Sequence, residues 1–127
     1  MNRLFVYGSL MKGELNAHLM AGARLVGSAQ TVPAYRLVHL GGYPGMLSGG
    51  GSSVVGEVYE VPAATLAVLD AFEEHPEVFV RTPVRLQTQP AVAGADAEAA
   101  CEAYLLRPEF AAGAAALEHG NWRQRHR

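Results

Sequence analysis

Two prolines bound the clearest helical segment of the chain, and they constrain its fold more than any other feature. Pro62 suits the first turn of a helix, where its missing N–H group is not needed, and apolar residues recur at helical spacing after it. Pro76 disfavours a helical backbone at His75. We therefore predict one helix over residues 62–74, ending at or before His75.

Most of the other apolar segments have the alternation or the β-branched and aromatic content that is typical of strands. The predicted strands cover residues 3–7, 24–40, 46–47, 53–61, 78–89 and 99–106. We predict turns at 41–45 and at the glycine run 49–51, a loop at 90–97, and a short helix at 111–117. One main helix among strands joined by turns predicts an α+β fold, a small mixed and mainly antiparallel β-barrel, formed by residues 1–127 as a single domain.

The composition argues against several classes of function. The formal net charge is −2, so we expect neither a nucleic-acid partner nor a membrane-surface partner. No segment has the length and purity of a transmembrane helix, and the N-terminus lacks a signal-peptide pattern, so a cytoplasmic location is expected. The single cysteine, Cys101, excludes an internal disulfide, and we expect it to be a small buried apolar residue.

One carboxylate falls on the apolar face of the predicted helix. With Leu66 at 0° on a helical wheel, Leu69 lies at about 300° and Glu73 at about 340°, between the two leucines. Burial and the negative end of the helix dipole would both raise the pKa of Glu73. A carboxylate with a raised pKa suits a general base that works near neutral pH.

Two structural interpretations of Glu73 stay open beside the catalytic one. The last helical turn can fray and expose the carboxylate to water, or Glu73 can form a salt bridge with Arg81 or Arg85. The neighbouring acids are weaker candidates: Asp70, at about 40°, borders the apolar face, and Glu74, at about 80°, is better placed for solvent.

The first strand ends abruptly in Tyr7-Gly8-Ser9-Leu10. Gly8 lets the backbone turn sharply, and successive N–H groups at such a turn can bind an anion or a carbonyl oxygen; an ordinary strand-to-loop turn also explains these residues. No G-x-S-x-G surrounds Ser9, so we expect no serine nucleophile. The histidines lack metal-ligand spacing and the glycines form no nucleotide-binding motif, so we expect neither a metal nor a cofactor.

A series of short motifs extends along nearly the whole chain. They are Phe5-Val6-Tyr7-Gly8-Ser9-Leu10, Lys12-Gly13 with Asn16, Gly42-Tyr43-Pro44, Gly56-Glu57-Val58-Tyr59, Leu69-Asp70-x-Phe72-Glu73, Arg81-Thr82-x-Val84, Tyr104 and Gly120-Asn121-Trp122. This ordered set resembles the γ-glutamylcyclotransferase-like family, which includes γ-glutamylamine cyclotransferases and AIG2-like proteins. The resemblance implies a compact mixed barrel with a central cavity.

The resemblance also implies an activity and a site. The backbone of Tyr7, Gly8, Ser9 and Leu10 would border the substrate, and Glu73 would act as the general acid and base. The implied substrate is a small molecule, a γ-glutamyl-amine or γ-glutamyl-amino acid, which is converted to 5-oxoproline and a free amine. Because the nucleophile belongs to the substrate and ring closure is intramolecular, this reaction requires neither a metal nor a cofactor.

One position departs from the family pattern. Phe79 stands where many members have a tyrosine in the strand after the glutamate, and Tyr104 is the residue that could supply the missing hydroxyl group. Two alternatives to the enzyme therefore stay open: a non-catalytic barrel that binds a small metabolite, and an interaction module that uses the glycine-rich hairpin at 49–51. Loops 41–53 and 90–97 are where we expect the amine half of the substrate to be selected.

Overall fold

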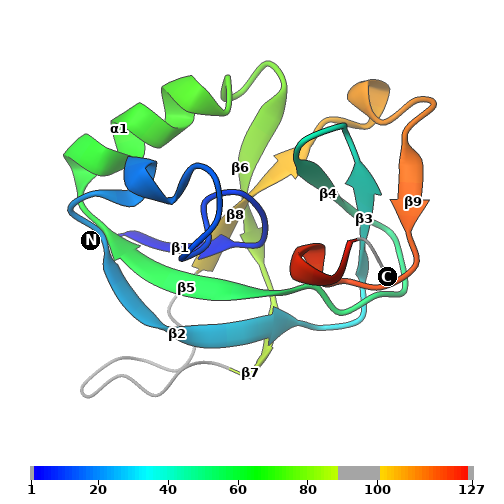
Figure 1. Cartoon of the computed structure of the whole chain (residues 1–127), viewed down its shortest axis with the longest axis horizontal. Coiled ribbons are helices and arrows are strands. Elements are labelled where there is room, and N and C mark those ends of the chain that lie inside the picture. The colour runs from blue at the N-terminus through cyan, green and yellow to red at the C-terminus, as the bar shows by residue number, and fades with distance from the viewer. Residues whose placement is uncertain (1, 89–100, 126–127) are drawn as a thin grey trace.

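The structure is a computed structural model that describes residues 2–88 and 101–125 (Figure 1). Its strands are β1 (Asn2–Val6), β2 (Arg24–Thr31), β3 (Tyr35–His39), β4 (Pro44–Ser48), β5 (Val55–Val61), β6 (Phe79–Val84), β7 (Leu86–Thr88), β8 (Cys101–Leu106) and β9 (Ala115–Leu117). Its helices are α1 (Ala63–Phe72) and three short 3-10 helices (Ala17–Met20, Pro108–Phe110 and Trp122–Gln124).

All nine strands belong to one mixed, mainly antiparallel sheet. Its hydrogen-bonded order is β7-β2-β5-β1-β8-β4-β3-β9, and β6 pairs with β8 outside this path. Strand β8 runs parallel to β1 and to β4, which pair with it at its two ends, and antiparallel to β6 on its other edge. The predicted α+β class, with one main helix and mostly antiparallel strands, is confirmed in the described part of the chain.

The predicted β-barrel is wrong, because the sheet does not close. The path of paired strands ends at β7 and β9, so the sheet curls without closing into a ring (Figure 1). Strands β6 and β7 are interrupted at Arg85, whose N–H group donates to the Tyr35 hydroxyl and whose carbonyl accepts from the Val32 N–H group. Arg85 thus separates β6, which pairs with β8, from β7, which pairs with β2.

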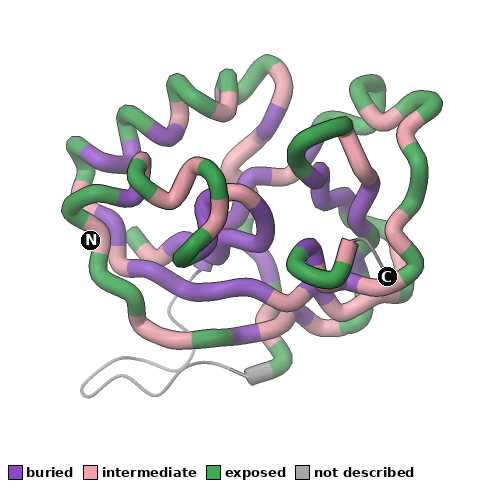
Figure 2. Tube along the Cα trace, viewed as in Figure 1, coloured by how far each residue is buried: buried purple, intermediate pink, exposed green. Residues whose placement is uncertain are grey.

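Strand β1 lies in the middle of the sheet, and its residues Leu4, Phe5 and Val6 are buried, so that both faces of this part of the strand are covered (Figure 2). Leu4 and Val6 pack in a hydrophobic cluster with the buried leucines of α1, whereas Phe5 and Tyr7 pack in a second cluster with Met46 and neighbouring residues. Alternate side chains of a strand point to opposite faces, so a strand covered on both faces is almost continuously apolar. This burial fixes the position of the turn that follows β1.

Helix α1 begins as predicted and ends before its predicted end. Pro62 precedes it in an extended conformation and accepts a hydrogen bond from the Leu66 N–H group. The helix ends at Phe72, and Glu73 is the C-terminal capping residue. Glu74 has a φ of 52°, a left-handed conformation that ends the helix, and the N–H group of His75 then donates to the Asp70 carbonyl. Glu73 is thus held just beyond the helix rather than within its last turn.

Several predicted boundaries are wrong for identifiable reasons. The predicted strand 24–40 is two strands separated at Pro33, and Pro44 and Gly45 start β4 instead of completing a turn. Residues 115–117 form β9 rather than part of a helix, because they pair with β3 and because Gly113 has a φ of 77°, which a helix cannot accommodate. The predicted loop 90–97 lies outside the described residues.

The expectation for Cys101 is met. Cys101 is buried, and burial raises the pKa of its thiol to about 12, so it is an inert apolar residue. In the described ranges, 2–88 and 101–125, no helix combines the length and the hydrophobicity needed to cross a bilayer.

Candidate active site

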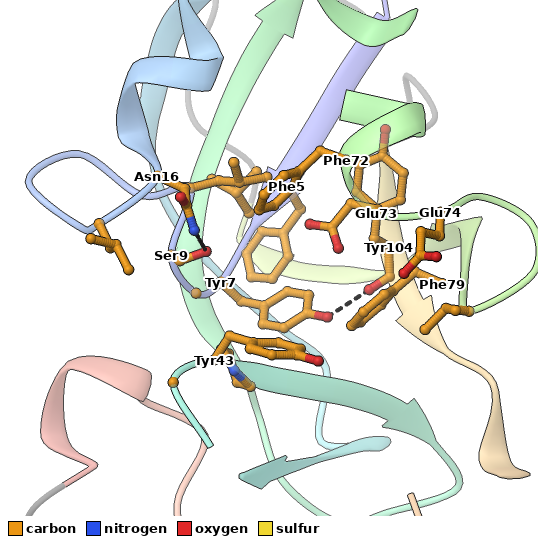
Figure 3. A pocket seen from close by; sticks show the side chains of 17 residues that line it. Phe5, Tyr7, Ser9, Asn16, Tyr43, Phe72, Glu73, Glu74, Phe79 and Tyr104 are labelled. Atoms are coloured by element: carbon orange, nitrogen blue, oxygen red, sulfur yellow. Dashed lines mark hydrogen bonds between the residues drawn. The ribbon is translucent and has the colours of Figure 1, made fainter. Parts of the chain in front are cut away.

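A pocket of about 340 Å³ lies where the end of β1, the end of α1, the turn before β4 and the start of β6 meet (Figure 3). It is lined by Phe5, Val6, Tyr7, Gly8, Ser9, Leu10, Leu15, Asn16, Gly42, Tyr43, Pro44, Phe72, Glu73, Glu74, Val78, Phe79 and Tyr104. The structure therefore brings all six residues of the predicted site, Glu73 and the five predicted substrate-binding residues, to one pocket. Its volume lies near the lower end of the range of about 300–1,000 Å³ that is usual for small-molecule sites.

The turn after β1 forms one wall of the pocket, and Gly8 is required there by close packing. A Cβ atom on Gly8 would lie 2.6 Å from Cγ and 2.7 Å from Cδ of Pro44, which is too close for any side chain. Among residues 2–88 and 101–125, the N–H groups of Gly8, Ser9 and Leu10 donate to no protein acceptor. Three consecutive free donors beside a pocket can bind a negatively charged oxygen.

Glu73 forms the opposite wall, and its carboxylate points into the pocket on the side of the Tyr7 and Tyr104 rings (Figure 3). Its backbone is fixed because its N–H group donates to the Leu69 carbonyl over 2.9 Å. The residue is half-buried, and burial raises the pKa of its carboxyl from the ordinary value of 4.5 to about 7. Glu73 can therefore both take up and return a proton near neutral pH.

The two structural interpretations of Glu73 do not describe this arrangement. Within the described part of the chain, its carboxylate forms no hydrogen bond and no ion pair. Arg81 instead pairs with Asp70 on one side and with Glu102 on the other. Arg85 is exposed and lies beyond β6, outside the pocket lining. An unpaired, half-buried carboxylate has a free energy cost that a structural role does not explain.

A hydrogen-bonded network holds the two tyrosines of the pocket in place. The Tyr7 hydroxyl donates to the Tyr104 carbonyl over 2.6 Å and accepts from the Met46 N–H group over 3.2 Å. The Tyr104 hydroxyl donates to Asp70 Oδ1 over 2.6 Å, and Arg81 binds both carboxylate oxygens of Asp70. The pKa values of both tyrosines are raised, mainly by burial, so their hydroxyls stay protonated.

Asp70 stays ionised in this network. Burial opposes its ionisation, but the hydrogen bonds from Arg81 and Tyr104 together outweigh burial and lower its pKa. Asp70 is therefore a fixed anion that orients Tyr104, whereas Glu73, three residues later, is the carboxylate that can exchange a proton. Phe79 is buried in the pocket wall and has no hydroxyl group. The Tyr104 hydroxyl already donates its hydrogen to Asp70, so toward a ligand it can only accept a hydrogen bond.

Several pocket residues were missed by the sequence analysis. The side-chain amide of Asn16 donates to Ser9 Oγ over 2.9 Å, and its backbone N–H group donates to the Ser9 carbonyl over 2.8 Å. Asn16 thus fixes the turn and leaves the Ser9 hydroxyl hydrogen free to donate to a ligand. Glu74 is exposed, as predicted, yet it also lines the pocket. Asn16 belongs to the opening motif of the chain, and its place in that motif is the sequence feature that could have identified it as a pocket residue.

The loop after the turn is braced by the C-terminal segment. Glu57 Oε1 accepts from the Lys12 N–H group over 2.7 Å, and the guanidinium of Arg123 donates to the Lys12 carbonyl over 2.6 Å. Trp122, next to Arg123, is buried in the same core cluster as Leu10 and Met11. The C-terminal segment therefore supports the pocket wall without lining it.

The described residues contain no group of three or more histidine, cysteine, aspartate or glutamate side chains with the arrangement of a metal site. The pocket offers a proton-exchanging carboxylate, free backbone donors and an apolar wall. This combination suits a small substrate that carries its own nucleophile.

Comparison with known proteins places this chain in a family. The family model "Gamma-glutamyl cyclotransferase, AIG2-like" matches residues 4–124. The chain therefore belongs to the gamma-glutamylcyclotransferase, AIG2-like family, and the predicted resemblance is confirmed. This relationship supports gamma-glutamylcyclotransferase-like activity on a small molecule that carries a γ-glutamyl group.

Individual relatives agree with the family assignment. The gamma-glutamylcyclotransferase family protein YtfP of Escherichia coli K12 is 44% identical over 85 residues, which span 64% of this chain and 74% of that protein. Gamma-glutamylaminecyclotransferase A of Danio rerio is 36% identical over 93 residues, which span 66% of this chain and 58% of that protein.

Solved structures have the same fold. The crystal structure of a mouse AIG2-like protein superposes with a TM-score of 0.76 at 31% identity, covering 94% of this chain and 87% of the mouse chain. The solution structure of Escherichia coli YtfP superposes with a TM-score of 0.69 at 34% identity, covering 98% and 99% of the two chains.

Proposed function

We propose that this protein is a cyclotransferase that converts a γ-glutamyl-amine or γ-glutamyl-amino acid to 5-oxoproline and a free amine, with Glu73 as the general acid and base. The observation that carries the proposal is the unpaired carboxylate of Glu73, with a pKa of about 7, across the pocket from three free N–H groups. The family relationship supports the same reaction class.

The first step is activation of the nucleophile within the substrate. The α-amino group of a γ-glutamyl amide is protonated at neutral pH and cannot attack. Glu73 takes one proton from it, and the neutral amine attacks the γ-carbonyl carbon, which closes a five-membered ring. A base with a pKa near the working pH is effective because it is available in both protonation states. The ring closure is intramolecular, so holding the substrate in one conformation supplies much of the rate enhancement.

The second step is departure of the amine. The tetrahedral intermediate carries a negative oxygen, and its carbon–nitrogen bond to the leaving amine breaks as the carbonyl re-forms. Protonated Glu73 gives its proton to the departing nitrogen, which leaves as a neutral amine. The ring nitrogen became positively charged on attack, and its extra proton passes through the restored Glu73 carboxylate to the released amine, so that the products are the neutral lactam and an ammonium ion and Glu73 is again ionised. The N–H groups of Gly8, Ser9 and Leu10 offer hydrogen bonds to the negative oxygens of the substrate, and such preorganised donors stabilise developing charge.

The buried aromatic wall has a separate role. Phe5, Tyr7, Phe79 and Tyr104 line the pocket, and the two tyrosine hydroxyls are already engaged within the protein. This wall keeps water from competing with the amine for the γ-carbonyl. In this proposal Phe79 contributes apolar surface, whereas the polar groups of the substrate bind to the Gly8 turn, the Ser9 hydroxyl and Glu73.

The test is release of 5-oxoproline, detected by mass spectrometry, from a panel of γ-glutamyl-amines and γ-glutamyl-amino acids. Wild-type protein should release it, and Glu73→Gln should lower kcat by at least about a hundredfold, the usual contribution of a general base. Glu77→Gln is the matched control, because Glu77 is an exposed carboxylate outside the pocket lining. Full activity of Glu73→Gln would refute the mechanism. Ligand binding without any release would favour a metabolite-binding protein of the same fold.

A further inference from the structure

The turn of residues 73–78 joins α1 to β6 and carries Glu73 at its first position (Figure 1). In the described part of the chain, the Glu73 carboxylate has no hydrogen-bond or ion-pair partner, so its own side chain does not hold it in the pocket. The place of the carboxylate therefore depends on the backbone of the turn. Glu74, the next residue, has a left-handed φ of 52°, which costs free energy unless neighbouring contacts hold it.

The backbone of this turn is tied at both ends. The N–H groups of Glu73 and His75 each donate over 2.9 Å to a carbonyl of α1, and the Val78 carbonyl accepts over 2.9 Å from the Arg107 N–H group, just beyond β8. Between these ends, and among the residues that the structure describes, His75 is the one residue of the turn whose side chain forms a hydrogen bond. We therefore examine what its ring contacts.

The His75 ring connects the turn to β6. Its Nδ1 atom accepts from the Arg81 N–H group over 3.0 Å. A backbone N–H group can only donate, so Nδ1 carries no hydrogen. Among the described strands β6 pairs with β8 alone, and Nδ1 thus covers a donor on the unpaired edge of β6. The ring also lies edge-on to the ring of Tyr104 in the pocket wall, with centroids 6.4 Å apart.

We propose that His75 is a positioning residue for Glu73: its Nδ1 acceptor ties the turn to β6 and so keeps the Glu73 carboxylate inside the pocket. The inference rests on the proposed function, in which Glu73 exchanges protons with the substrate. His75 lies outside the pocket lining, so it acts through Glu73 and not on the substrate. Losing the tie should lower kcat and leave KM nearly unchanged, because the Gly8 turn still binds the substrate.

Two substitutions separate the acceptor from the ring. His75→Asn keeps an acceptor, the side-chain carbonyl oxygen, near the position of Nδ1 and loses most of the ring. His75→Phe keeps a ring beside Tyr104 and has no acceptor for the Arg81 N–H group. We expect His75→Phe to lower kcat for 5-oxoproline release by at least about tenfold, with KM and the kcat of His75→Asn within about threefold of wild type, because a small misplacement of a reacting group costs this much. An active His75→Phe beside an impaired His75→Asn would overturn the inference.

A matched control separates position from stability. Thr65 Oγ1 donates to the Ala21 carbonyl over 2.8 Å, near the start of α1 and outside the pocket lining. Thr65→Val removes this one side-chain-to-backbone hydrogen bond, as His75→Phe removes the other. It should lower the urea midpoint of unfolding and leave kcat at the wild-type value. An equal loss of kcat in the two variants would show that lost stability, and not the position of Glu73, lowers the activity.

NMR separates this inference from the proposed function. The side-chain carboxyl carbon of Glu73 is followed in protein labelled with carbon-13 glutamate, and its signal is identified by its absence in Glu73→Gln. Burial raises the pKa of Glu73 to about 7 in the wild-type protein. In His75→Phe the released carboxylate reaches water, so its pKa should fall toward the ordinary value of 4.5, whereas in His75→Asn it should stay near 7.

This titration decides the inference without any turnover. The expected fall supports the role of His75 even if wild-type protein releases no 5-oxoproline from any substrate, an outcome that would refute the proposed function alone. A Glu73 pKa that stays near 7 in His75→Phe would overturn the inference.

Discussion

Replacing Glu73 by glutamine should stabilise the protein at alkaline pH. The pKa of Glu73 moves from its ordinary value of 4.5 to about 7 because folding buries the carboxylate. The folded protein therefore binds the proton more tightly than the unfolded chain does. Below pH 4.5 Glu73 is protonated in both states, and as the pH rises through 7 the folded state must hold a buried charge and loses stability.

The size of the effect follows from the same pKa. One pKa unit corresponds to about 1.4 kcal/mol. Ionisation of Glu73 thus lowers the free energy of unfolding by about 3 kcal/mol at pH 8, relative to about pH 4. Glutamine has nearly the same shape and never ionises, so Glu73→Gln avoids this loss. Any cost of burying its amide is independent of pH.

Urea unfolding measures the effect directly. Trp122 is the single tryptophan of the chain and is buried, so its fluorescence reports unfolding. The free energy of unfolding of Glu73→Gln minus that of wild-type protein should rise by about 3 kcal/mol between about pH 4 and pH 8. The other titrating groups are common to both proteins and cancel. The control Glu77→Gln should show a small difference at both pH values, and a pH-independent difference for Glu73→Gln would refute the reasoning.

Two further substitutions test how the site is built. Gly8→Ala places a methyl group against the Pro44 ring and should lower the free energy of unfolding by about 1–3 kcal/mol, measured in urea, with a loss of 5-oxoproline release as the turn moves. Asp70→Asn weakens the acceptor that Tyr104 and Arg81 share and should cost about 1–2 kcal/mol at pH 7. Because these partners lower the pKa of Asp70, the second cost should shrink as the pH falls below about 4.

Each of these substitutions has a control or a contrary outcome. Gly42→Ala is the control for Gly8→Ala, since a Cβ atom on Gly42 meets nothing within 4 Å, and its stability should equal that of wild-type protein. Equal stability of Gly8→Ala would mean that the turn does not depend on close packing. A cost of Asp70→Asn that stays constant from neutral to acidic pH would mean that the charge of Asp70 contributes nothing.

Local sequence patterns predicted the elements of the fold better than their arrangement. Apolar periodicity located α1 and most strands, because these patterns depend on residues that are close in sequence. The parallel pairing of β1 with β8 depends on residues about a hundred positions apart, and β9 forms only because β3 offers it an edge. Neither pairing is indicated by a local sequence pattern, so the order of the strands and the open sheet could be seen only in the structure.

The residues of the candidate site also fall into those that local sequence patterns predicted and those that they did not. Glu73 was found on a helical wheel because its neighbours Leu66 and Leu69 fix the apolar direction of α1, although the helix ends one residue before it. Leu15 and Tyr43 lie in irregular loops, where no periodicity tells which side chains face inward. Their place in the pocket lining follows from the packing of loops against one another, which no local sequence pattern predicts.

The hydrogen bond between Tyr7 and Tyr104 joins residues 97 positions apart, at the centre of the pocket. Contacts between such distant residues slow folding, because the entropic cost of closing a long loop comes before the native interactions that offset this cost. During synthesis, β1 can pair with β5 long before β8 exists. The pocket therefore cannot be complete before β8 has joined the sheet, and a partly folded form in which β8 is unpaired cannot carry the assembled site.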